Sequence, residues 1–587
     1  MEYYKNSWDL SDIRFKDINS AYQRIEEIIT EIEGYKTSFK KISRKKFHNI
    51  LNLNEELSIV SDRIYTPIYL KLSENCNNSK ANQEMAKFKN IMTNVSNRLI
   101  FLNHYITKMP SKKFNYLKGG LNEDQIIVLD GVRAEKKYML SQKVEEIASL
   151  KDSTGISVVL SNYNKLTSSF KFSFKKGKKI KKLTESEIAF YCNNPDRKLR
   201  EKAYKKINEK YEEFGSIISD CYMAKVKNWG DNAKLRGYKT PISVRNRGNE
   251  ISDKIIENML ESTRENRFLF QNYFKLKKKV CDIKGKFKRT DIYAPSKTKI
   301  NKKIPFKEAV KIVLETFEQF SPEYKKMAEL MFKERHVHSI KSKNKRSGAY
   351  CMGVPPGFLP YVFLNYNGSL NDVSTLAHEL GHALHDILAC KEHNIFTNHP
   401  SLPLAETASI FSERLLSDRL MSESKNKKVK KQLLVERIDG SFASVLRQSY
   451  FVIFEKQAHD LINSTEGTNL DELCDLYMST LEEQFGNTIE IQKHFKNEWM
   501  RIPHIFRTPF YCYAYSIGEL LTLSLFEEYK EKGKEFVSKH KRILSAGGSD
   551  IPEYILKNED IDISKKDFWQ KGFDIIKKDV IDLEKLL

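Results

Sequence analysis

Cysteine, proline and long apolar runs are all scarce in this 587-residue chain. Its 8 cysteines form no Cys-x-x-Cys pair. An even number of cysteines does not indicate a disulfide framework in so long a chain, so we expect free thiols in a reducing compartment. No run of about 18 or more apolar residues occurs, and no membrane-spanning helix is expected. Residues 1–9 lack the apolar core of a signal peptide, which predicts a cytoplasmic protein.

Negative charge is also in short supply, because 77 Asp and Glu stand against 100 Lys and Arg, a formal net charge of +23. A basic balance of this size can indicate a nucleic-acid or anionic-lipid partner. Here the basic runs, such as residues 175–179 and 277–279, are short and scattered, and no nucleic-acid-binding motif accompanies them. We therefore expect a solvated basic surface, with neither nucleic acid nor a membrane as partner.

Apolar residues recur at helical spacing along most of the chain. Residues 17–33, for example, carry isoleucines at three-to-four spacing, which forms one apolar stripe on a helix. The 15 prolines are few enough to permit long helices. The pattern predicts a mainly α fold, with further helical segments at residues 84–107, 184–234, 252–280, 306–335 and 427–486.

Two segments interrupt the helical pattern. Residues 283–304 have basic flanks and predict a connection between helical blocks. Residues 336–372 are rich in Gly, Pro, Tyr and Val, which indicates short strands and tight turns, and we expect the only substantial β-structure here. His336 and His338 would share one side of a strand, in a cleft wall or at the surface.

A His-Glu-x-x-His motif follows this segment at residues 378–382. On a helix, His378 and His382 lie four apart on one face, where both imidazoles can bind one zinc ion. Apolar residues occupy the other faces, so the helix is predicted to be buried, and buried histidines need polar partners. Glu379 would accept a proton from a zinc-bound water as that water attacks a carbonyl. The motif thus predicts a zinc peptidase.

A catalytic zinc site needs a third protein ligand and an open position. The longer motif with a third His ten residues after the first is excluded, because Leu388 stands there. Glu406 lies on an apolar helix among small residues, and we choose it as the third ligand. Glu413, two turns further on, would orient a ligand His, the alternative being a surface ion pair. Weaker ligand candidates, expected in loops or at the surface, are His385, His393 and His399.

These features resemble oligoendopeptidase F, of the thimet oligopeptidase-like zinc metallopeptidase family. The resemblance includes the His-Glu-Leu-Gly-His helix, the Glu406 helix and the segment 345–350. Several separate matches in the right order are far more specific than the zinc motif alone. They extend over nearly the whole chain, at residues 8–12, 235–238, 291–295, 364–368 and 544–549.

The resemblance implies an elongated multi-helix zincin body, with a small β-sheet beside the active-site helix and a deep substrate channel that holds one zinc ion. Residues 1–195 would form an N-terminal helical region, and residues 196–587 the catalytic domain. The stretch 347–353 would form a strand edge along the channel, to which a short peptide adds by main-chain hydrogen bonds. The implied activity is that of an intracellular endopeptidase for short oligopeptides.

The family also uses a His and tyrosines from a late helical segment, which here matches residues 502–515. Such side chains donate hydrogen bonds to the oxyanion that develops when a peptide carbonyl is attacked. The resemblance assigns Tyr513 and Tyr515 as donors and His504 as a substrate or transition-state contact. Tyr511 is an alternative to either tyrosine, and an aromatic core cluster is the alternative for all of them.

Two other functions stay open. A metallocarboxypeptidase on a similar helical scaffold would need a basic residue for the C-terminal carboxylate, and Arg501 and Arg507 are candidates. A catalytically silent peptide-binding homologue is the second, although the presence of Glu379 argues against it.

Overall fold

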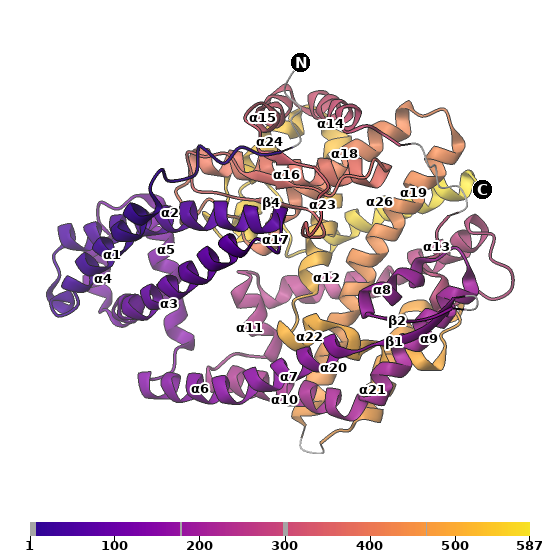
Figure 1. Ribbon diagram of the computed structural model, residues 1–587, viewed down its shortest axis with the longest axis horizontal. Helices are drawn as coiled ribbons and strands as arrows, with labels where there is room; N and C mark the ends of the chain where they lie inside the picture. Colours follow the sequence, from indigo (N-terminus) through magenta and orange to yellow (C-terminus); the bar gives the residue numbers. More distant parts are fainter. Residues whose placement is uncertain (1–6, 177–178, 297–302, 465–466) are drawn as a thin grey trace. The chain divides into compact units, whose positions relative to one another are not determined.

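The computed structural model describes residues 7–176, 179–296, 303–464 and 467–587, and these are mainly helical (Figure 1). The chain divides into two compact units, each assembled from three stretches of sequence. Unit 1 comprises Met1–Lys137, Asn301–Arg419 and Glu528–Asp560, and unit 2 comprises Tyr138–Ile300, Leu420–Glu527 and Ile561–Leu587. The mainly α fold class is confirmed, and the domain boundary after residue 195 stays a prediction.

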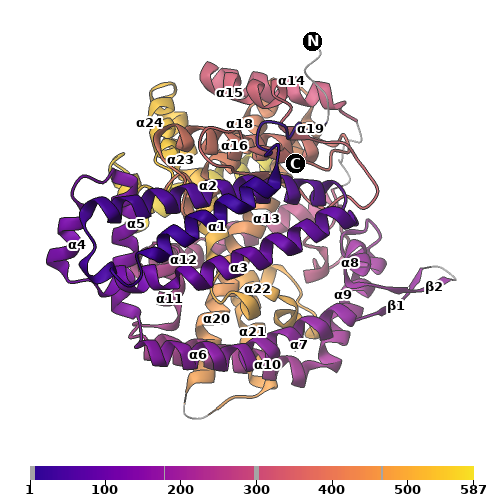
Figure 2. The ribbon, with the colours of Figure 1, turned by 60° about the vertical axis from the view of Figure 1, so that its left-hand side comes forward.

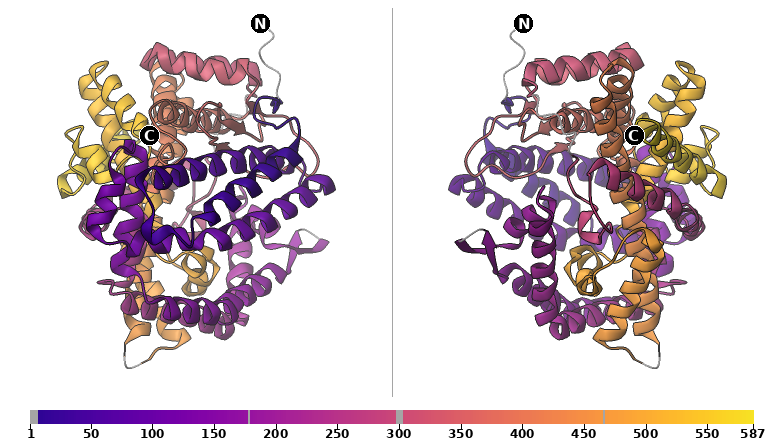
Figure 3. Two further views of the ribbon diagram at one scale, coloured as in Figure 1. Left: turned by 90° about the vertical axis from the view of Figure 1, so that its left-hand side faces the viewer. Right: turned by 90° about the vertical axis from the view of Figure 1, so that its right-hand side faces the viewer.

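Unit 1 begins with a bundle in which the first three helices pack against one another (Figures 2 and 3). The first of them shows why: the Asp17 carboxylate accepts hydrogen bonds from two backbone N–H groups of the first turn, and four isoleucines are buried along one face. The bundle consists of α1 (Ile18–Gly34), α2 (Arg44–Glu74), α3 (Ser79–Lys108), α4 (Ser111–Lys118) and α5 (Glu123–Ala134).

The rest of unit 1 surrounds one buried helix, α16 (Leu370–Glu392). Helix α16 packs against α14, α15 and α24 (Figure 1). The other helices of this part are α14 (Phe306–Phe320), α15 (Pro322–Lys333), α17 (Leu402–Ala405), most of α18 (Thr407–Glu423), α24 (Glu535–Ser545) and α25 (Pro552–Lys557).

A small three-stranded sheet lies beside α16, as predicted. Its order is β3 (Val337–His338), β5 (Tyr361–Phe363), β4 (Tyr350–Met352), with β3 parallel and β4 antiparallel to β5. Strands β4 and β5 both contact α16. Among the described residues, no strand pairs with the second edge of β4. In the described part of the chain, β4 is therefore an edge strand, next to the helix that carries the His-Glu-x-x-His motif.

The surface or cleft-wall position expected for His336 and His338 is wrong. Both are buried, at 2% and 6% exposed. The His336 ring stacks on Tyr361 with centroids 4.1 Å apart, and the His338 ring lies 4.8 Å from that of Trp8. These histidines therefore join the core that links the N-terminal segment to the sheet.

Unit 2 is mainly helical, and its described residues include one antiparallel strand pair. Its helix α20 (Arg447–Asn463) packs against α10 and α21. Its other α-helices are α6 (Gln142–Thr154), α7 (Ile156–Ser169), α8 (Glu185–Ala189), α9 (Arg197–Glu213), α10 (Gly215–Leu235), α11 (Pro241–Gly248), α12 (Asp253–Glu265), α13 (Arg267–Val280), α19 (Lys427–Ser441), α21 (Leu470–Phe485), α22 (Pro503–Arg507), most of α23 (Tyr513–Lys532) and α26 (Lys566–Lys585).

The strand pair corrects the expectation that β-structure is confined to residues 336–372. Strands β1 (Phe172–Lys176) and β2 (Lys179–Leu183) pair antiparallel, and β1 packs against α9 (Figure 2). Phe172 and Phe174 are buried on one face of β1. The abundance of lysine masked this alternation in the sequence.

The predicted helical segments are otherwise present, with breaks. Residues 184–234 divide into α8, a 3-10 turn η3 (Phe190–Asn193), α9 and α10, because Pro195 interrupts the pattern. The connection 283–304 contains a short 3-10 turn, η4 (Arg289–Asp291). Residues 297–302 of that connection, 177–178 of the first basic run and 1–6 of the N-terminal segment lie outside the described residues.

The described residues bear on two expectations, namely that the cysteines are free thiols and that no helix spans a membrane. All eight cysteines are present as free thiols. None of the helices in the described part of the chain combines the length and the apolar character that a membrane span requires.

Candidate metal centre

The metal motif lies in the middle of α16. Ser369 caps this helix, accepting a hydrogen bond from the Asp372 N–H while the Asp372 carboxylate accepts from the Ser369 N–H. His378 and His382 then fall on one face, with ring centroids 4.9 Å apart. Helix periodicity alone therefore brings the two imidazoles together.

Gly381, between the two histidines, lets the neighbouring helix approach. A Cβ atom at this position would lie 2.6 Å from the Ala408 carbonyl oxygen and 2.7 Å from the Ser409 Cα, both on α18. Only a residue without a side chain permits this contact. The close approach carries Glu406, at the junction of α17 and α18, up to the two histidines.

The third donor predicted from the sequence, Glu406, meets both imidazoles. Its Oε2 lies 3.4 Å from His378 Nε2 and 3.5 Å from His382 Nε2, and the three residues form a group able to hold a metal ion. Donor atoms on one tetrahedral zinc, each at about 2.0–2.1 Å, are about 3.3–3.4 Å apart. The spacing and the two-nitrogen, one-carboxylate donor set therefore fit a zinc ion with an open position.

Hydrogen bonds orient the donors. Glu413 Oε1 lies 2.5 Å from His378 Nδ1, and Glu413 Oε2 accepts from the Ser374 hydroxyl at 2.9 Å. The Ser409 hydroxyl donates to Glu406 Oε2 at 2.9 Å. Such contacts fix the tautomer and direction of a metal-binding group. The contact between Glu413 and His378 is the one predicted from the sequence, in place of a surface ion pair.

The charge of these groups depends strongly on their surroundings. Burial lowers the pKa of His378, but the hydrogen bond that its ring donates to Glu413 and the nearby carboxylates outweigh burial and raise the pKa to about 9. Burial and the neighbouring His378 lower the pKa of His382 to about 4. In the absence of a cation, His378 thus carries the positive charge that balances the acidic groups around it.

Glu379 is 5% exposed and lies against the sheet. Burial raises the pKa of its carboxyl to about 7, and the charges of Glu406 and Glu413 add to the rise, while the positive charge of His378 and the Cys351 backbone N–H oppose it. A carboxyl with a pKa near neutrality can both take and return a proton at neutral pH. Cys351 belongs to β4, so this strand influences the pKa of the Glu379 carboxyl.

We predict that Gly381→Ala destabilises the protein and weakens zinc binding. The added methyl must displace α18, and overpacking of this kind costs about 1–3 kcal/mol. Thermal unfolding and zinc titration measure the two effects. Gly131→Ala in α5 is the matched control, because nothing lies within 4 Å of its Cβ position; it should stabilise by about 0.5–1 kcal/mol. Equal stability of Gly381→Ala and the wild type would refute the packing role.

Of the weaker ligand candidates, His385 is not at the surface as expected. It is 4% exposed on α16, and burial lowers its pKa to about 3. His393 follows the end of α16, where its Nδ1 lies 2.9 Å from the Asp124 carboxylate. His399 lies in the loop before α17, with 55% of its side chain exposed. The metal-holding group found among the described residues contains none of the three.

The late segment predicted to contribute to the transition state belongs to unit 2. His504 lies on α22, and its ring stacks with that of Tyr511 at a centroid distance of 5.7 Å. The Tyr515 ring is 6.1 Å from His504 and 5.5 Å from Tyr511. Tyr513 differs, because it is fully buried and its hydroxyl accepts a hydrogen bond from Asn249 at 2.9 Å.

A buried acid holds the loop before these tyrosines. Phe510 adopts a positive φ of 61°, which is unfavourable for a residue with a side chain. Its N–H donates to Glu455 Oε1 at 2.8 Å, and Arg245 donates to the Pro509 carbonyl at 3.1 Å. Glu455 was missed in the sequence, although an acid directly after the apolar run 450–454 was a signal for it.

The chain is similar to known peptidases along its whole length. The model of peptidase family M3 matches residues 190–575. An oligoendopeptidase F homolog of Borreliella burgdorferi is 28% identical, with 99% of this chain and 98% of that protein covered. The oligopeptidase PepF of Bacillus subtilis is 24% identical, with 99% and 87% covered.

The fold is shared with a solved structure. Oligoendopeptidase-F from Enterococcus faecium superposes with a TM-score of 0.75 at 19% identity, over 97% of this chain and 98% of that one. The family match includes the stretch that holds His378, His382 and Glu406. The chain therefore belongs to peptidase family M3, as an oligoendopeptidase F-like metallopeptidase.

Proposed function

We propose that this protein is a zinc-dependent endopeptidase that hydrolyses short oligopeptides. The observation that carries the proposal is the group His378, His382 and Glu406, whose donor spacing suits one zinc ion, with Glu379 buried beside it. A bound zinc would supply Lewis-acid polarisation of water and of the scissile carbonyl. His378, His382 and Glu406 are the residues that would hold it.

Glu379 is the general base in this proposal. Its carboxylate takes the proton of the attacking water and returns it to the leaving amine as the peptide bond breaks. The pKa of about 7 that burial gives this group suits both steps, because the ideal catalytic pKa lies near the working pH.

We propose that the peptide binds along the open edge of β4. An extended peptide that pairs with a strand edge is held by main-chain hydrogen bonds, which read few side chains. The segment before β4 is held in place, since the Asn365 side chain donates to the carbonyls of Arg346 and Gly348 at 2.8 and 2.7 Å. Because main-chain pairing reads few side chains, we expect the enzyme to accept peptides of many sequences. We also infer that a deep channel restricts access to short, unstructured peptides.

We assign the stabilisation of the developing oxyanion to the late segment. Tyr515 and His504 are the preferred donors. The buried hydroxyl of Tyr513, already hydrogen-bonded to Asn249, favours a supporting role for that residue over the direct contact predicted from the sequence. Tyr511 stays the alternative donor.

Tyr515→Phe is predicted to lower kcat by about 10²–10³-fold while KM changes little, the effect of losing one oxyanion donor. Steady-state kinetics on one fluorogenic peptide measure it, with Tyr511→Phe as the comparison. A variant that raises KM at unchanged kcat would instead make Tyr515 a contact for the ground-state substrate.

Cleavage of peptides blocked at both ends tests the proposed function. N-acetylated, C-amidated peptides of graded length should still be cut at internal bonds, with activity lost as the peptides lengthen or fold. Mass spectrometry of the products gives the cleavage sites. Removal of single residues from free C-termini alone, with blocked peptides left intact, would establish the metallocarboxypeptidase instead.

We also propose a cytoplasmic location. Eight free thiols, with no disulfide bond among them, suit a reducing compartment. Cell fractionation with an antibody to the chain tests this, and recovery in a secreted fraction would contradict it.

A further inference from the structure

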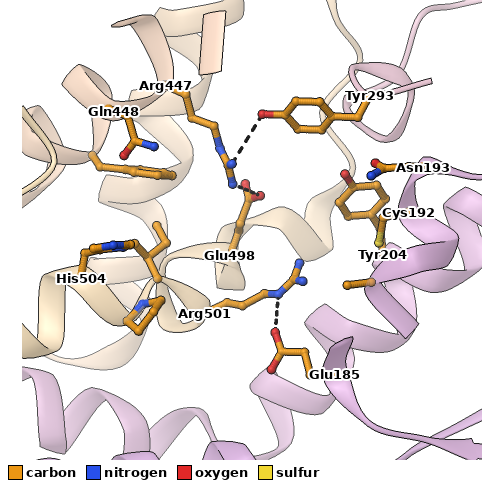
Figure 4. A pocket seen from close by; sticks show the side chains of 14 residues that line it. Glu185, Cys192, Asn193, Tyr204, Tyr293, Arg447, Gln448, Glu498, Arg501 and His504 are labelled. Atoms are coloured by element: carbon orange, nitrogen blue, oxygen red, sulfur yellow. Dashed lines mark hydrogen bonds and ion pairs between the residues drawn. The ribbon is translucent and has the colours of Figure 1, made fainter. Parts of the chain in front are cut away.

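A cavity of about 460 Å³ lies within unit 2 (Figure 4). Its wall is formed by α8 and η3, by the first turn of α20, by the 3-10 helix η7 (Lys493–Arg501) and by the start of α22. Arg447, Arg501 and His504 all line it. The size is typical of a site for a small group. Because His504 also belongs to the segment assigned to the transition state, the cavity adjoins proposed substrate-binding residues.

Arg447 lines this cavity, and the hydrogen-bonding capacity of its guanidinium is only partly used. Its contacts are long, 3.4 Å from Nη2 to Glu498 Oε1 and 3.5 Å from Nη1 to the Tyr293 hydroxyl (Figure 4). Its Nε is buried without a hydrogen-bond partner in the described part of the chain. Charge-assisted bonds between guanidinium and carboxylate are normally about 2.7–2.9 Å long. Arg447 therefore has donors available for a closer acceptor.

Glu498 is already engaged by other groups. Arg289 Nη2 donates to both of its oxygens, at 2.9 and 3.0 Å, and the Tyr477 hydroxyl donates at 3.2 Å. Buried carboxylates are stabilised by close, paired contacts of this kind. Glu498 thus neutralises Arg289 first and leaves much of the charge of Arg447 uncompensated.

Arg501 is held by a second carboxylate. Its Nε donates to Glu185 Oε1 at 2.6 Å, and the Tyr211 hydroxyl donates to Glu185 Oε2 at 2.8 Å. Figure 4 shows the outer nitrogens of Arg501 on the side away from Glu185. Around the cavity, the guanidinium groups of Arg289, Arg447 and Arg501 thus face the carboxylates of Glu185 and Glu498. The arrangement has a surplus of one positive charge.

The backbone before Arg447 is unusual as well. A π-helical turn, η5 (Phe442–Leu446), joins α19 to α20 and ends immediately before Arg447. Such turns are rare, and they occur frequently at functional sites. The next residue, Gln448, lines the cavity with a buried amide oxygen that has no hydrogen-bond partner among the described residues. The guanidinium of Arg447 and the amide oxygen of Gln448, side by side, complement a terminal carboxylate and the peptide N–H that precedes it.

We propose that this cavity binds a carboxylate of the peptide substrate, foremost the C-terminal carboxylate, with Arg447 as its principal donor. The inference rests on the proposed peptidase function and adds a preference to it. Peptides that end in a free carboxylate should bind more tightly than the same peptides ending in an amide. Cleavage itself does not require the contact, so amidated peptides stay substrates.

The test measures binding in the zinc-loaded Glu379→Gln variant, which should hold peptide without cutting it. Calorimetry compares one peptide as free acid and as amide, and a third peptide, amidated but with Glu as its last residue in place of Gln. The free acid should bind about 10–100-fold more tightly than the amide, as expected for a hydrogen bond to a charged group. Rescue by the Glu side chain would assign the cavity to side-chain carboxylates, and equal binding of all three peptides would overturn the proposal.

Arg447→Met in the same background should abolish the preference and leave binding of the amide unchanged. Arg447→Lys keeps the charge but loses the fork, so it should retain part of the preference. Arg264→Met is the matched control, because Arg264 is a more exposed arginine of unit 2 that pairs with Glu483 outside the cavity. Thermal unfolding shows whether each variant folds. If Arg447→Met does not fold, the comparison between Arg447→Lys and the wild type decides the question. Full preference in a folded Arg447 variant would refute the assignment.

Kinetics of the otherwise wild-type enzyme separate this proposal from the function on which it rests. The free acid should have a lower KM than the amide at similar kcat, and Arg447→Met should remove the difference. If neither peptide is cut, the peptidase function fails, while the binding comparison still decides whether the cavity holds a carboxylate.

Discussion

Replacement of Glu379 by glutamine is expected to leave zinc bound and to lower kcat by about 10²–10⁴-fold, the usual contribution of a general acid–base group. Glutamine has nearly the same shape, but it cannot accept a proton from water. The buried position beside β4 should therefore be filled without repacking. Kinetics on a fluorogenic peptide and metal analysis of the same preparation measure the two properties together.

The matched control for this variant is Glu392→Gln, at the exposed end of the same helix. It removes the same charge from α16 and should keep full activity. Normal turnover by Glu379→Gln would contradict the assignment of the general base. Loss of zinc from Glu379→Gln would instead give this carboxylate a role in holding the metal.

Glu406→Ala is expected to reduce the metal content from about one zinc per chain to a small fraction. Only His378 and His382 would remain as donors, and two imidazoles do not complete a catalytic zinc site. Activity should be lost with the metal. Metal analysis after dialysis against a weak chelator gives the stoichiometry, and activity with added zinc shows whether binding is merely weakened.

Glu413→Gln provides a graded comparison for Glu406→Ala. Glu413 contacts the back of the His378 ring and lies outside the donor set, so its loss should weaken zinc binding by about 10–100-fold without abolishing it. The order of the two effects distinguishes a ligand from a group that orients one. Tight zinc binding by Glu406→Ala, with loss in Glu413→Gln, would exchange the two roles.

Much of the metal centre could be predicted from the sequence because it depends on local geometry. The spacing of His378 and His382 places them on one helical face whatever surrounds the helix. The prediction of Glu406 as a ligand required a further assumption, that small residues allow a second helix to approach α16. The close contact between Gly381 and α18 is the basis of that approach. The contact between Glu413 and His378 follows, since both helices are then fixed side by side.

Burial was harder to predict than secondary structure. His336, His338 and His385 were expected in exposed or loop positions, yet each is buried against groups distant in sequence. A polar side chain looks the same in the sequence whether it faces water or a stacked ring. Local periodicity also failed for β1, whose buried phenylalanines alternate with residues in a lysine-rich stretch.

By itself, the sequence determined the mainly helical class and the helix that carries His378, Glu379 and His382, because both follow from spacing within single helices. The choice of Glu406 also came from the sequence, but it depended on small residues that let a second helix approach. The tertiary structure alone decided the burial of His336 and His338 and the cavity around Arg447. The arginines and carboxylates of that cavity come from separate segments between residues 185 and 501. The surplus of positive charge over these carboxylates arises only when folding brings the segments together.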